Sequence, residues 1–350
     1  MKRHGNLFER IIDMENLLAA HENARRGKTH YREVKMVDRD PERYAQAIHQ
    51  MLKDQTYEVG DYDIITRVVD SGKERTIYRL DYFPHRIIHH AILQIMEPIW
   101  VKSMIADTYC CIKGRGIHKA AKKLARILRE DQASTAYCLK IDIKKYYPSV
   151  DHEILKSVIR RKIKDHRLLA LLDQVIDSAT GLPIGNYLSQ YFANLYLNDF
   201  DHYLKEALRV RYYFRYCDDI VILGSSKNYL REVFSHIVAF LAKLKLQVKE
   251  NWQIFPVKAR GIDFLGYRFF HGYTLLRKRI AKKVLKLSRS IEKAGQITAR
   301  QYKSLMSYYG WLKYGNCRNL RRKVYNDNIF RIVAIYTNGQ NLRNALQGLA

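Results

Sequence analysis

Three aspartates stand where a folded chain rarely places a carboxylate that lacks a partner. Asp142 ends a nearly continuous apolar stretch, and Asp218 and Asp219 lie in an apolar segment that is typical of two strands joined by a tight turn. Buried strands seldom carry carboxylates unless these are paired or bind cations. If the turn lies beside the end of the Asp142 strand, the acids form a cluster that can hold two Mg²⁺ ions for phosphoryl or nucleotidyl transfer.

An ordinary turn is the alternative interpretation of Asp218 and Asp219, because Asp is common in turns. The apolar strands on both sides of this pair, and a second strand that ends in Asp142, favour the metal site.

The elements that must position these acids alternate between strand and helix. Apolar patterning predicts, in order, strand, helix, helix, strand, turn, strand, helix and strand. The segments are 136–143, a helix from about Pro148, 185–208, 211–226, 229–246 and 247–255. This order resembles that of a split βαβ sheet layered on helices, so the predicted fold class is α+β.

The flanking segments are also assigned from their pattern. Residues 1 to about 55 carry helical periodicity, and 57–83 are typical of short strands with a turn at 70–73. A helix follows Pro84, and from about residue 277 the chain is rich in Lys and Arg and is predicted to be helical.

The composition favours nucleic acid as the partner. The chain has 350 residues, with 62 Lys and Arg against 35 Asp and Glu, a net charge of +27, and 26 tyrosines that suit stacking on bases and riboses. A basic soluble enzyme or a membrane-surface protein is the alternative. The sequence lacks an apolar run of bilayer length, its N-terminus is charged throughout, and its five cysteines are an odd number. We therefore expect a cytoplasmic protein with reduced thiols and no membrane partner.

Four ordered segments resemble the palm motifs of reverse transcriptases. They are KIDIKKYYPSV (140–150), LPIGNYLSQYFANLYL (182–197), YCDDIVIL (216–223) and FLGYRF (264–269). The resemblance covers about residues 60–325 and implies a right-hand polymerase with fingers, a ferredoxin-like palm and a helical thumb. The implied divisions are an N-terminal helical region 1–56, fingers 57–135, a palm 136–273 that shares about 150–185 with the fingers, and a thumb 274–350.

The resemblance also implies roles for the acids. Asp142 and Asp218 would be the direct ligands of two Mg²⁺ ions, for which Mn²⁺ can substitute, and Asp219 would be a second acid with a lesser or structural role. The backbone carbonyl of Ile143 would complete one metal shell. The implied enzyme is an RNA-directed DNA polymerase, whose partners are a template RNA, a primer or cDNA 3′ end and deoxynucleoside triphosphates (dNTPs).

The choice of sugar is assigned to Tyr147, five residues after Asp142. In reverse transcriptases an aromatic side chain at this position packs under the sugar and excludes a 2′-hydroxyl. The alternative is that Tyr146 or Tyr147 is simply part of the core.

Basic side chains are candidates for the triphosphate and for proton transfer. Arg75 best resembles the arginine of the fingers, and Lys73, Arg79 and Arg86 would add to the grip. A solvated basic strand is the alternative for Lys73 and Arg79. Lys249 is a candidate general acid for the departing pyrophosphate, although Trp252 lies nearer the place expected from the motif.

The segment from Leu182 to Gln190 indicates which reverse transcriptases are most similar. Most members have Gln-Gly and then Ser-Pro here, whereas this chain has Ile184-Gly185 and then Ser189-Gln190. That pattern resembles the bacterial and phage enzymes of diversity-generating retroelements, which copy a template RNA with errors opposite adenine. Ile184 and Gly185 would lie against the incoming dNTP, with Ile184 lowering fidelity. A small basic helical accessory protein is a further implied partner.

Other functions remain open from the sequence. A defence-associated (antiphage) or group II-like bacterial reverse transcriptase is one alternative, although the Asn-Ala-x-x-His and Val-Thr-Gly signatures of retron enzymes are absent. A non-catalytic RNA-binding palm protein is another, against which the intact Asp142, Asp218 and Asp219 count.

Overall fold

The computed structural model describes residues 3–68, 72 and 74–337. The chain divides into two compact units. Unit 1 comprises 1–114, 141–220 and 233–252, and unit 2 comprises 115–140, 221–232 and 253–350. In the described parts of the chain, no helix combines the length and the apolar character needed to cross a membrane.

Unit 1 begins with the helices that the periodicity predicts. They are α1 (Phe8–Ile12), α2 (Met14–Ala24), α3 (Arg32–Asp38) and α4 (Pro41–Lys53). Asp13 and Asp40 cap α2 and α4 by accepting backbone N–H groups of the first turn. Asp165 caps α8 (His166–Asp177). Its carboxylate also accepts hydrogen bonds from the backbone N–H groups of Leu7 (2.7 Å) and Phe8 (2.9 Å), which ties α1 to α8.

A two-stranded hairpin and a long helix follow. Strands β1 (Asp63–Val68) and β2 (Glu74–Arg79) pair antiparallel, and α5 (Ile87–Ser103) comes after a π-helical turn at Tyr82–Arg86. Asp70, Ser71 and Lys73 of the predicted turn lie outside the described residues. Helix α2 packs against α5.

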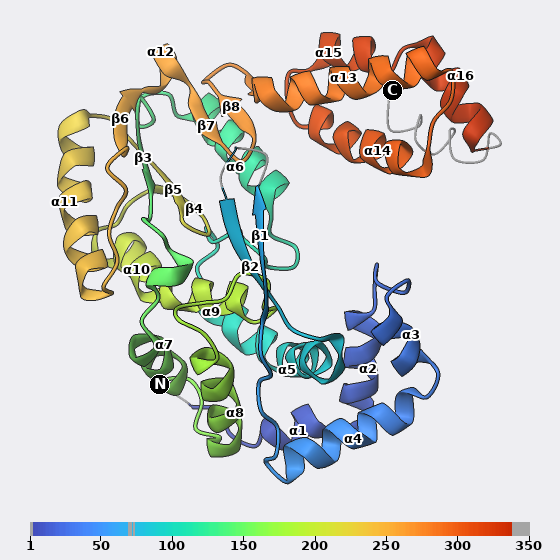
Figure 1. Ribbon diagram of the computed structural model, residues 1–350. Coiled ribbons are helices and arrows are strands. Elements are labelled where there is room, and N and C mark those ends of the chain that lie inside the picture. The colour runs from blue at the N-terminus through green and yellow to red at the C-terminus, as the bar shows by residue number, and fades with distance from the viewer. Residues whose placement is uncertain (1–2, 69–71, 73, 338–350) are drawn as a thin grey trace. The chain divides into compact units, whose positions relative to one another are not determined.

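The central four-stranded sheet has the topology expected of the palm (Figure 1). Its strands are β3 (Tyr137–Asp142), β4 (Tyr212–Tyr216), β5 (Asp219–Gly224) and β6 (Gln253–Pro256). The spatial order is β4-β5-β3-β6, and helices separate β3 from β4 and β5 from β6. In chain order the elements run βαββαβ. The first and last of these strands, β3 and β6, are neighbours in the sheet, and so are the two middle strands, β4 and β5, as in ferredoxin-like sheets. The predicted α+β fold with a ferredoxin-like palm is confirmed.

The helical segments between these strands differ in one place from the prediction. They are a 3₁₀ turn (Tyr147–Ser149), α7 (His152–Arg160), α8 (His166–Asp177), α9 (Ser189–Tyr196), α10 (Asn198–His202), a π turn (Tyr203–Ala207) and α11 (Lys227–Lys243). The single long helix expected over 185–208 was wrong. Gly185 has a φ of +120°, and the backbone N–H of Tyr78 donates to the carbonyl of Ile184 (2.7 Å), so this segment pairs with β2 and helix begins only at Ser189.

Unit 2 contains a basic helix, a small sheet and the C-terminal helices, the last of which were predicted from about residue 277. The elements are α6 (Ile117–Glu130), α12 (Val257–Arg260), β7 (Ile262–Phe264), β8 (Tyr267–Phe269), β9 (Thr274–Leu276), α13 (Lys278–Ala294), α14 (Ala299–Lys313), α15 (Arg318–Val324) and α16 (Asp327–Tyr336). The β7–β8 turn needs glycine, because Gly266 has a φ of +83° and a Cβ there would lie 2.5 Å from the Trp311 ring.

Candidate active site

Asp142 and Asp218 meet at the end of the palm sheet. Asp142 is the last residue of β3, and Asp218 lies in the turn between β4 and β5. The backbone N–H of Ile143 donates to the carbonyl of Asp218 (3.2 Å), which ties the turn to the residue after Asp142. Burial and the neighbouring Asp142 carboxylate raise the pKa of Asp218. The predicted approach of the two acids is therefore observed.

The turn of residues 217 and 218, called the catalytic turn after the role proposed for Asp218 below, is tight because Cys217 adopts a left-handed conformation with a φ of +58°. Positive φ values at the centre of a two-residue hairpin loop match the twist of the flanking strands. The Cys217 thiol points to the Tyr147 hydroxyl, with Sγ and the oxygen 3.6 Å apart.

The donor set fits Mg²⁺. Among the residues that the structure describes, no three His, Cys, Asp or Glu side chains gather as a metal site. Mg²⁺ is nevertheless commonly held by one or two carboxylates together with water and substrate phosphates, and the Asp142–Asp218 pair supplies two. Ligation by Asp142 and Asp218 stays a prediction, as does ligation by Asp219, the first residue of β5, and by the Ile143 carbonyl.

Lys249 reaches the acids. Its backbone N–H donates to the carbonyl of Asp142 (2.9 Å), and its ammonium contacts the Asp142 carboxylate. Trp252 instead stacks on Phe234, with ring centroids 3.9 Å apart. The structure thus brings Lys249, and not Trp252, to the candidate site, whereas its role as a general acid stays a prediction.

The two adjacent tyrosines have different surroundings. Tyr146 is buried and its hydroxyl donates to the carbonyl of Ala193, so it belongs to the core. Tyr147 is half-buried, and burial followed by the nearby Cys217 raises the pKa of its hydroxyl. Tyr147 is therefore the one of the pair that is placed beside the catalytic turn, and its role in sugar choice stays a prediction.

The segment that contains Ile184 and Gly185 is anchored on the hairpin of β1 and β2, called the fingers hairpin after the region predicted for it. The Tyr78–Ile184 hydrogen bond holds it, Ile184 is half-buried and Gly185 is exposed. A Cβ at Gly185 would lie 2.3 Å from the carbonyl oxygen of Tyr78. Only glycine allows this approach, while contact of either residue with a dNTP stays a prediction.

The predicted basic residues separate into two groups. Arg79, Arg86 and Gly185 line one cavity of about 260 Å³. The Arg86 guanidinium lies over the Tyr187 ring, 5.6 Å from its centroid, and burial lowers its pKa. Arg75 is exposed on β2, where it is the register partner of Arg67, and Lys73 lies outside the described residues.

More than half of this chain matches the model of one protein family. Residues 70–269 match the model of a family described as reverse transcriptase (RNA-dependent DNA polymerase). The chain belongs to the reverse transcriptase family. The right-hand polymerase fold that the motifs implied is thereby confirmed.

This chain is similar to bacterial relatives at modest identity. It is 26% identical to the Escherichia coli protein YkfC over 239 residues, which cover 55% of this chain and 61% of YkfC. It is 24% identical to the Escherichia coli retron Ec73 reverse transcriptase over 262 residues, 70% of this chain and 81% of that enzyme. Among solved structures, a Candida tropicalis telomerase in complex with a fragment of telomeric RNA aligns with a TM-score of 0.49 and 13% identity, over 83% of this chain and 61% of that one.

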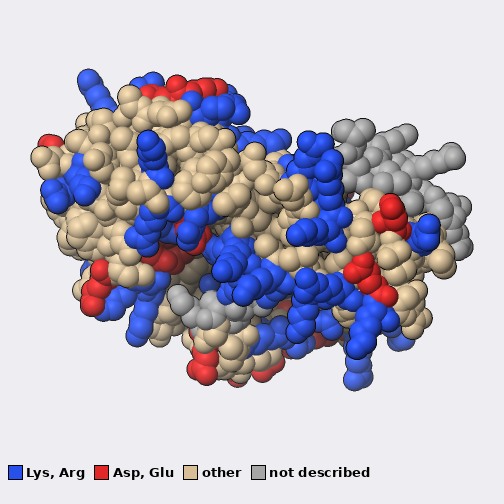
Figure 2. Space-filling model, turned by 90° about the horizontal axis from the view of Figure 1, so that it is seen from above, with Lys and Arg blue, Asp and Glu red and all other residues tan. Residues whose placement is uncertain are grey.

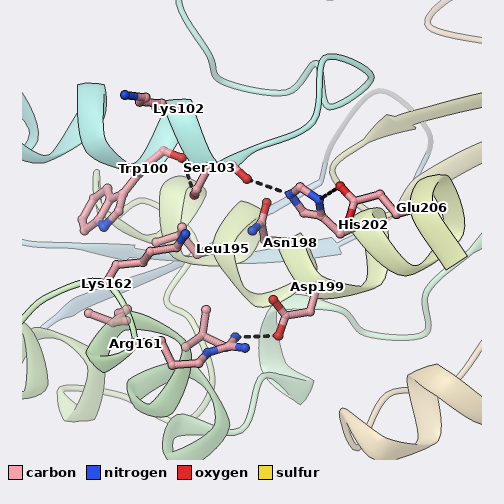
Figure 3. A pocket seen from close by; sticks show the side chains of 12 residues that line it. Trp100, Lys102, Ser103, Arg161, Lys162, Leu195, Asn198, Asp199, His202 and Glu206 are labelled. Carbon is pink, nitrogen blue, oxygen red and sulfur yellow. Dashed lines mark hydrogen bonds and ion pairs between the residues drawn. The ribbon is translucent and has the colours of Figure 1, made fainter. Parts of the chain in front are cut away.

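A second cavity, of about 440 Å³, opens among α5, α7, α9 and α10 (Figure 3). Its described lining includes none of the residues predicted from sequence. Arg161 contacts Asp199 (2.5 Å), and His202 lies between Glu206 (2.6 Å) and the Ser103 carbonyl (2.9 Å). These charged groups of the cavity therefore largely satisfy one another.

One buried charged pair, Arg215 and Asp201, was not predicted from the sequence. The available signal was an arginine in the apolar β4 segment, whereas Asp201 lies in the polar stretch NDFDH (198–202) and did not stand out. Charges at such positions are rare in cores unless they are paired.

Proposed function

We propose that this chain is an RNA-directed DNA polymerase that extends a primer 3′ end with dNTPs along a template RNA. The observation that carries the proposal is the meeting of Asp142 and Asp218, tied by the Ile143–Asp218 backbone hydrogen bond, at the end of a ferredoxin-like sheet in a member of the reverse transcriptase family. The chain spans 61% of the length of YkfC, and activity is therefore proposed from the site itself.

Asp142 and Asp218 would hold two Mg²⁺ ions, with Asp219 and the Ile143 carbonyl as further ligands. When bound, the ions activate the attacking 3′-hydroxyl and neutralise the charge of the triphosphate. Lys249, whose ammonium contacts Asp142, would release that carboxylate and donate a proton to the departing pyrophosphate. Arg75, Arg79 and Arg86 would bind the triphosphate, and Tyr147 would exclude the 2′-hydroxyl.

The distribution of charge supports a nucleic-acid partner. Unit 2 carries 29 Lys and Arg against six Asp and Glu, a net charge of +23 out of the +27 of the whole chain. Figure 2 shows Lys and Arg side chains spread over one face of the molecule. Helix α13 alone has seven such residues in 17: Lys278, Arg279, Lys282, Lys283, Lys286, Arg289 and Lys293. A surface of this kind attracts the phosphates of template and primer.

The finer proposal is that the polymerase belongs to a diversity-generating retroelement and copies template adenines inaccurately. Its support is Ile184 in place of the usual Gln, on a segment that the Tyr78–Ile184 hydrogen bond fixes at the fingers. Ile cannot form the hydrogen bonds with which Gln can hold a sugar or the neighbouring backbone in one geometry. A small basic helical accessory protein is a proposed partner, and a cytoplasmic location is part of the same proposal.

Primer extension tests the general proposal. Purified protein, a primed RNA template, dNTPs and Mg²⁺ should give a full-length cDNA, and Asp142→Ala should lower the rate by about three decades or more. RNA binding, followed by fluorescence anisotropy, should remain within about twofold of the wild type. A wild-type protein that binds RNA but never extends the primer would instead support a non-catalytic RNA-binding protein.

Sequencing of the cDNA tests the finer proposal. Wild-type protein on an adenine-rich template should misincorporate most often opposite adenine, and Ile184→Gln should lower this error rate about tenfold, because 1.4 kcal/mol of discrimination corresponds to one decade. Accurate copying by the wild type, with and without an accessory protein, would favour a defence-associated or group II-like enzyme.

A further inference from the structure

Arg215 and Asp201 form a buried, two-pronged ion pair behind the catalytic turn. Both side chains have no exposed surface. The Arg215 Nε donates to Asp201 Oδ1 (2.7 Å) and Nη2 donates to Oδ2 (2.6 Å), which is the parallel geometry that a guanidinium and a carboxylate prefer. The hydroxyls of Tyr213 (2.6 Å) and Thr108 (2.9 Å) also donate to the carboxylate. Asp201 is therefore held from several sides and fixes the plane of the guanidinium.

The remaining nitrogen of the guanidinium reaches the catalytic turn. Arg215 Nη1 donates to the carbonyl of Cys217 (3.2 Å) and to the side-chain oxygen of Asn194 (3.2 Å). Cys217 is the residue in the left-handed conformation and directly precedes Asp218. The Cys217–Asp218 peptide is thus anchored through its carbonyl by a side chain that α10 orients.

The backbone of Arg215 is fixed as well. Its N–H donates to the carbonyl of Asp107 (3.0 Å), and its carbonyl accepts from the N–H of Tyr109 (3.0 Å). The side chain therefore projects from a point on β4 that is held independently of the turn.

Stability alone does not account for this arrangement. A buried ion pair is often no more stabilising than apolar side chains of the same volume, because both charges lose their hydration. An apolar pair would leave the Cys217 carbonyl without the Arg215 donor. What the guanidinium supplies beyond core packing is a directed hydrogen bond to the turn.

We propose that Arg215 is a positioning residue of the polymerase site, which holds Asp218 in place opposite Asp142 through the Cys217 carbonyl, with Asp201 orienting the guanidinium. The proposal rests on the proposed polymerase function. It assigns no contact of Arg215 or Asp201 with substrate.

Arg215→Lys is the decisive variant. Lysine keeps the charge beside Asp201, but its single ammonium cannot reproduce the two-pronged pair and also reach the Cys217 carbonyl. We expect kcat to fall at least about tenfold and the Mg²⁺ concentration for half-maximal rate to rise several-fold. The KM for dNTP and the Kd for RNA should stay within about twofold. Mn²⁺ should restore part of the rate, because it binds the same ligands more tightly than Mg²⁺ does.

Tyr196→Phe is the matched control. It removes a fully buried tyrosine hydroxyl that donates to the carbonyl of Leu244 (2.7 Å). The Arg215 contacts with Asp201 and Cys217 stay in place. We expect a lower Tm with unchanged kcat and Mg²⁺ dependence. If Tyr196→Phe shifts the Mg²⁺ dependence as far as Arg215→Lys does, general loosening of the core explains both effects and the positioning role is wrong.

Two further measurements keep the outcomes distinct. Mn²⁺ binding, followed by electron paramagnetic resonance of the free ion, should weaken in Arg215→Lys even if no template is extended. Should that variant fail to fold, Asp201→Asn, which keeps the shape of the partner, should show the same direction of change in metal binding. Wild-type protein that binds Mn²⁺ but extends no primer counts against the polymerase, whereas unchanged Mn²⁺ binding and kcat in a folded Arg215→Lys overturn the positioning role.

Discussion

Replacing Gly185 by alanine should detach the segment around Ile184 from the fingers hairpin. The φ of +120° at Gly185 is one that residues with a Cβ rarely adopt, and the added Cβ would lie 2.3 Å from the Tyr78 carbonyl oxygen and 3.2 Å from Ile77 Cγ2. The backbone strain costs about 1–3 kcal/mol. Relief of the clash requires the Tyr78–Ile184 hydrogen bond to break, at about 0.5–1.5 kcal/mol. The local penalty is therefore about 1.5–4.5 kcal/mol.

Steady-state primer extension measures the effect. If the segment must be in place for the dNTP to bind and react, kcat/KM should fall by about 13- to 2,000-fold, because each 1.36 kcal/mol corresponds to one decade. Hydrogen exchange at the Tyr78 amide should become faster, since this N–H loses its acceptor. RNA affinity should not change, because no basic residue is altered.

Gly272→Ala is the control for this variant. A Cβ at Gly272 meets nothing within 4 Å, and this glycine is exposed. The control should match the wild type in Tm, kcat/KM and exchange at Tyr78. A Gly185→Ala protein that matched the control in all three would refute the reasoning, because the segment would then tolerate the strain without moving.

Three further predictions follow from the site and from the charge. Asp218→Asn should abolish extension and yet raise the Tm at pH 7 in the presence of a chelator, because a buried carboxylate with a raised pKa destabilises the folded protein once it ionises. The difference in Tm between variant and wild type should disappear as the pH falls through the raised pKa of Asp218, and thermal unfolding at several pH values measures this. Tyr147→Ala should raise ribonucleotide incorporation by about tenfold or more, since a relieved clash is worth about 1–3 kcal/mol, and unchanged discrimination between ribo- and deoxynucleotides would point to another gate. RNA affinity should fall with salt at a slope of log K against log salt of roughly −4 if about six phosphates are neutralised, whereas a flat titration would assign the positive charge to another partner.

Local patterning was sufficient for the parts of the site that lie on strands. A continuous apolar stretch that ends in Asp142 and an apolar hairpin around Asp218 predict buried strands whose ends carry acids, and the chain order of the elements then limits how they can pair. The observed order β4-β5-β3-β6 brings these two residues together.

Features that depend on tertiary contacts could not be predicted in this way. Helical periodicity extends from residue 185 to 208. The carbonyl of Ile184 nevertheless accepts a hydrogen bond from the backbone N–H of Tyr78 on β2, and the helix begins only at Ser189. The motif spacing predicted that Trp252, rather than Lys249, lies near the position expected for the general acid. The loop before β6 instead turns Lys249 toward Asp142, while Trp252 finds an aromatic partner in Phe234.

The energetic costs of the site are concentrated in the catalytic turn. Cys217 adopts a conformation that L-residues avoid, and Asp218 is a buried carboxylate beside another. The hydrogen bonds that hold these two residues come from Ile143 and from Arg215, outside the turn. Departures from the usual local rules are expected where function requires them and where the surrounding structure compensates.

The residues of the proposed chemistry and the charge of the proposed nucleic-acid surface fall on different parts of this chain. Unit 1 carries the acids, Lys249 and Tyr147 and is nearly balanced, with 33 Lys and Arg against 29 Asp and Glu, whereas unit 2 holds +23 of the net +27. Salt-dependent affinity for phosphates follows the number of basic contacts, and nucleotidyl transfer follows the placement of a few carboxylates. Neutral substitutions in unit 1 should therefore change kcat and the Mg²⁺ dependence at constant salt slope. Loss of two or three lysines from α13 should lower the salt slope and the RNA affinity while the Mg²⁺ dependence stays unchanged, and coupled changes in both would contradict this separation.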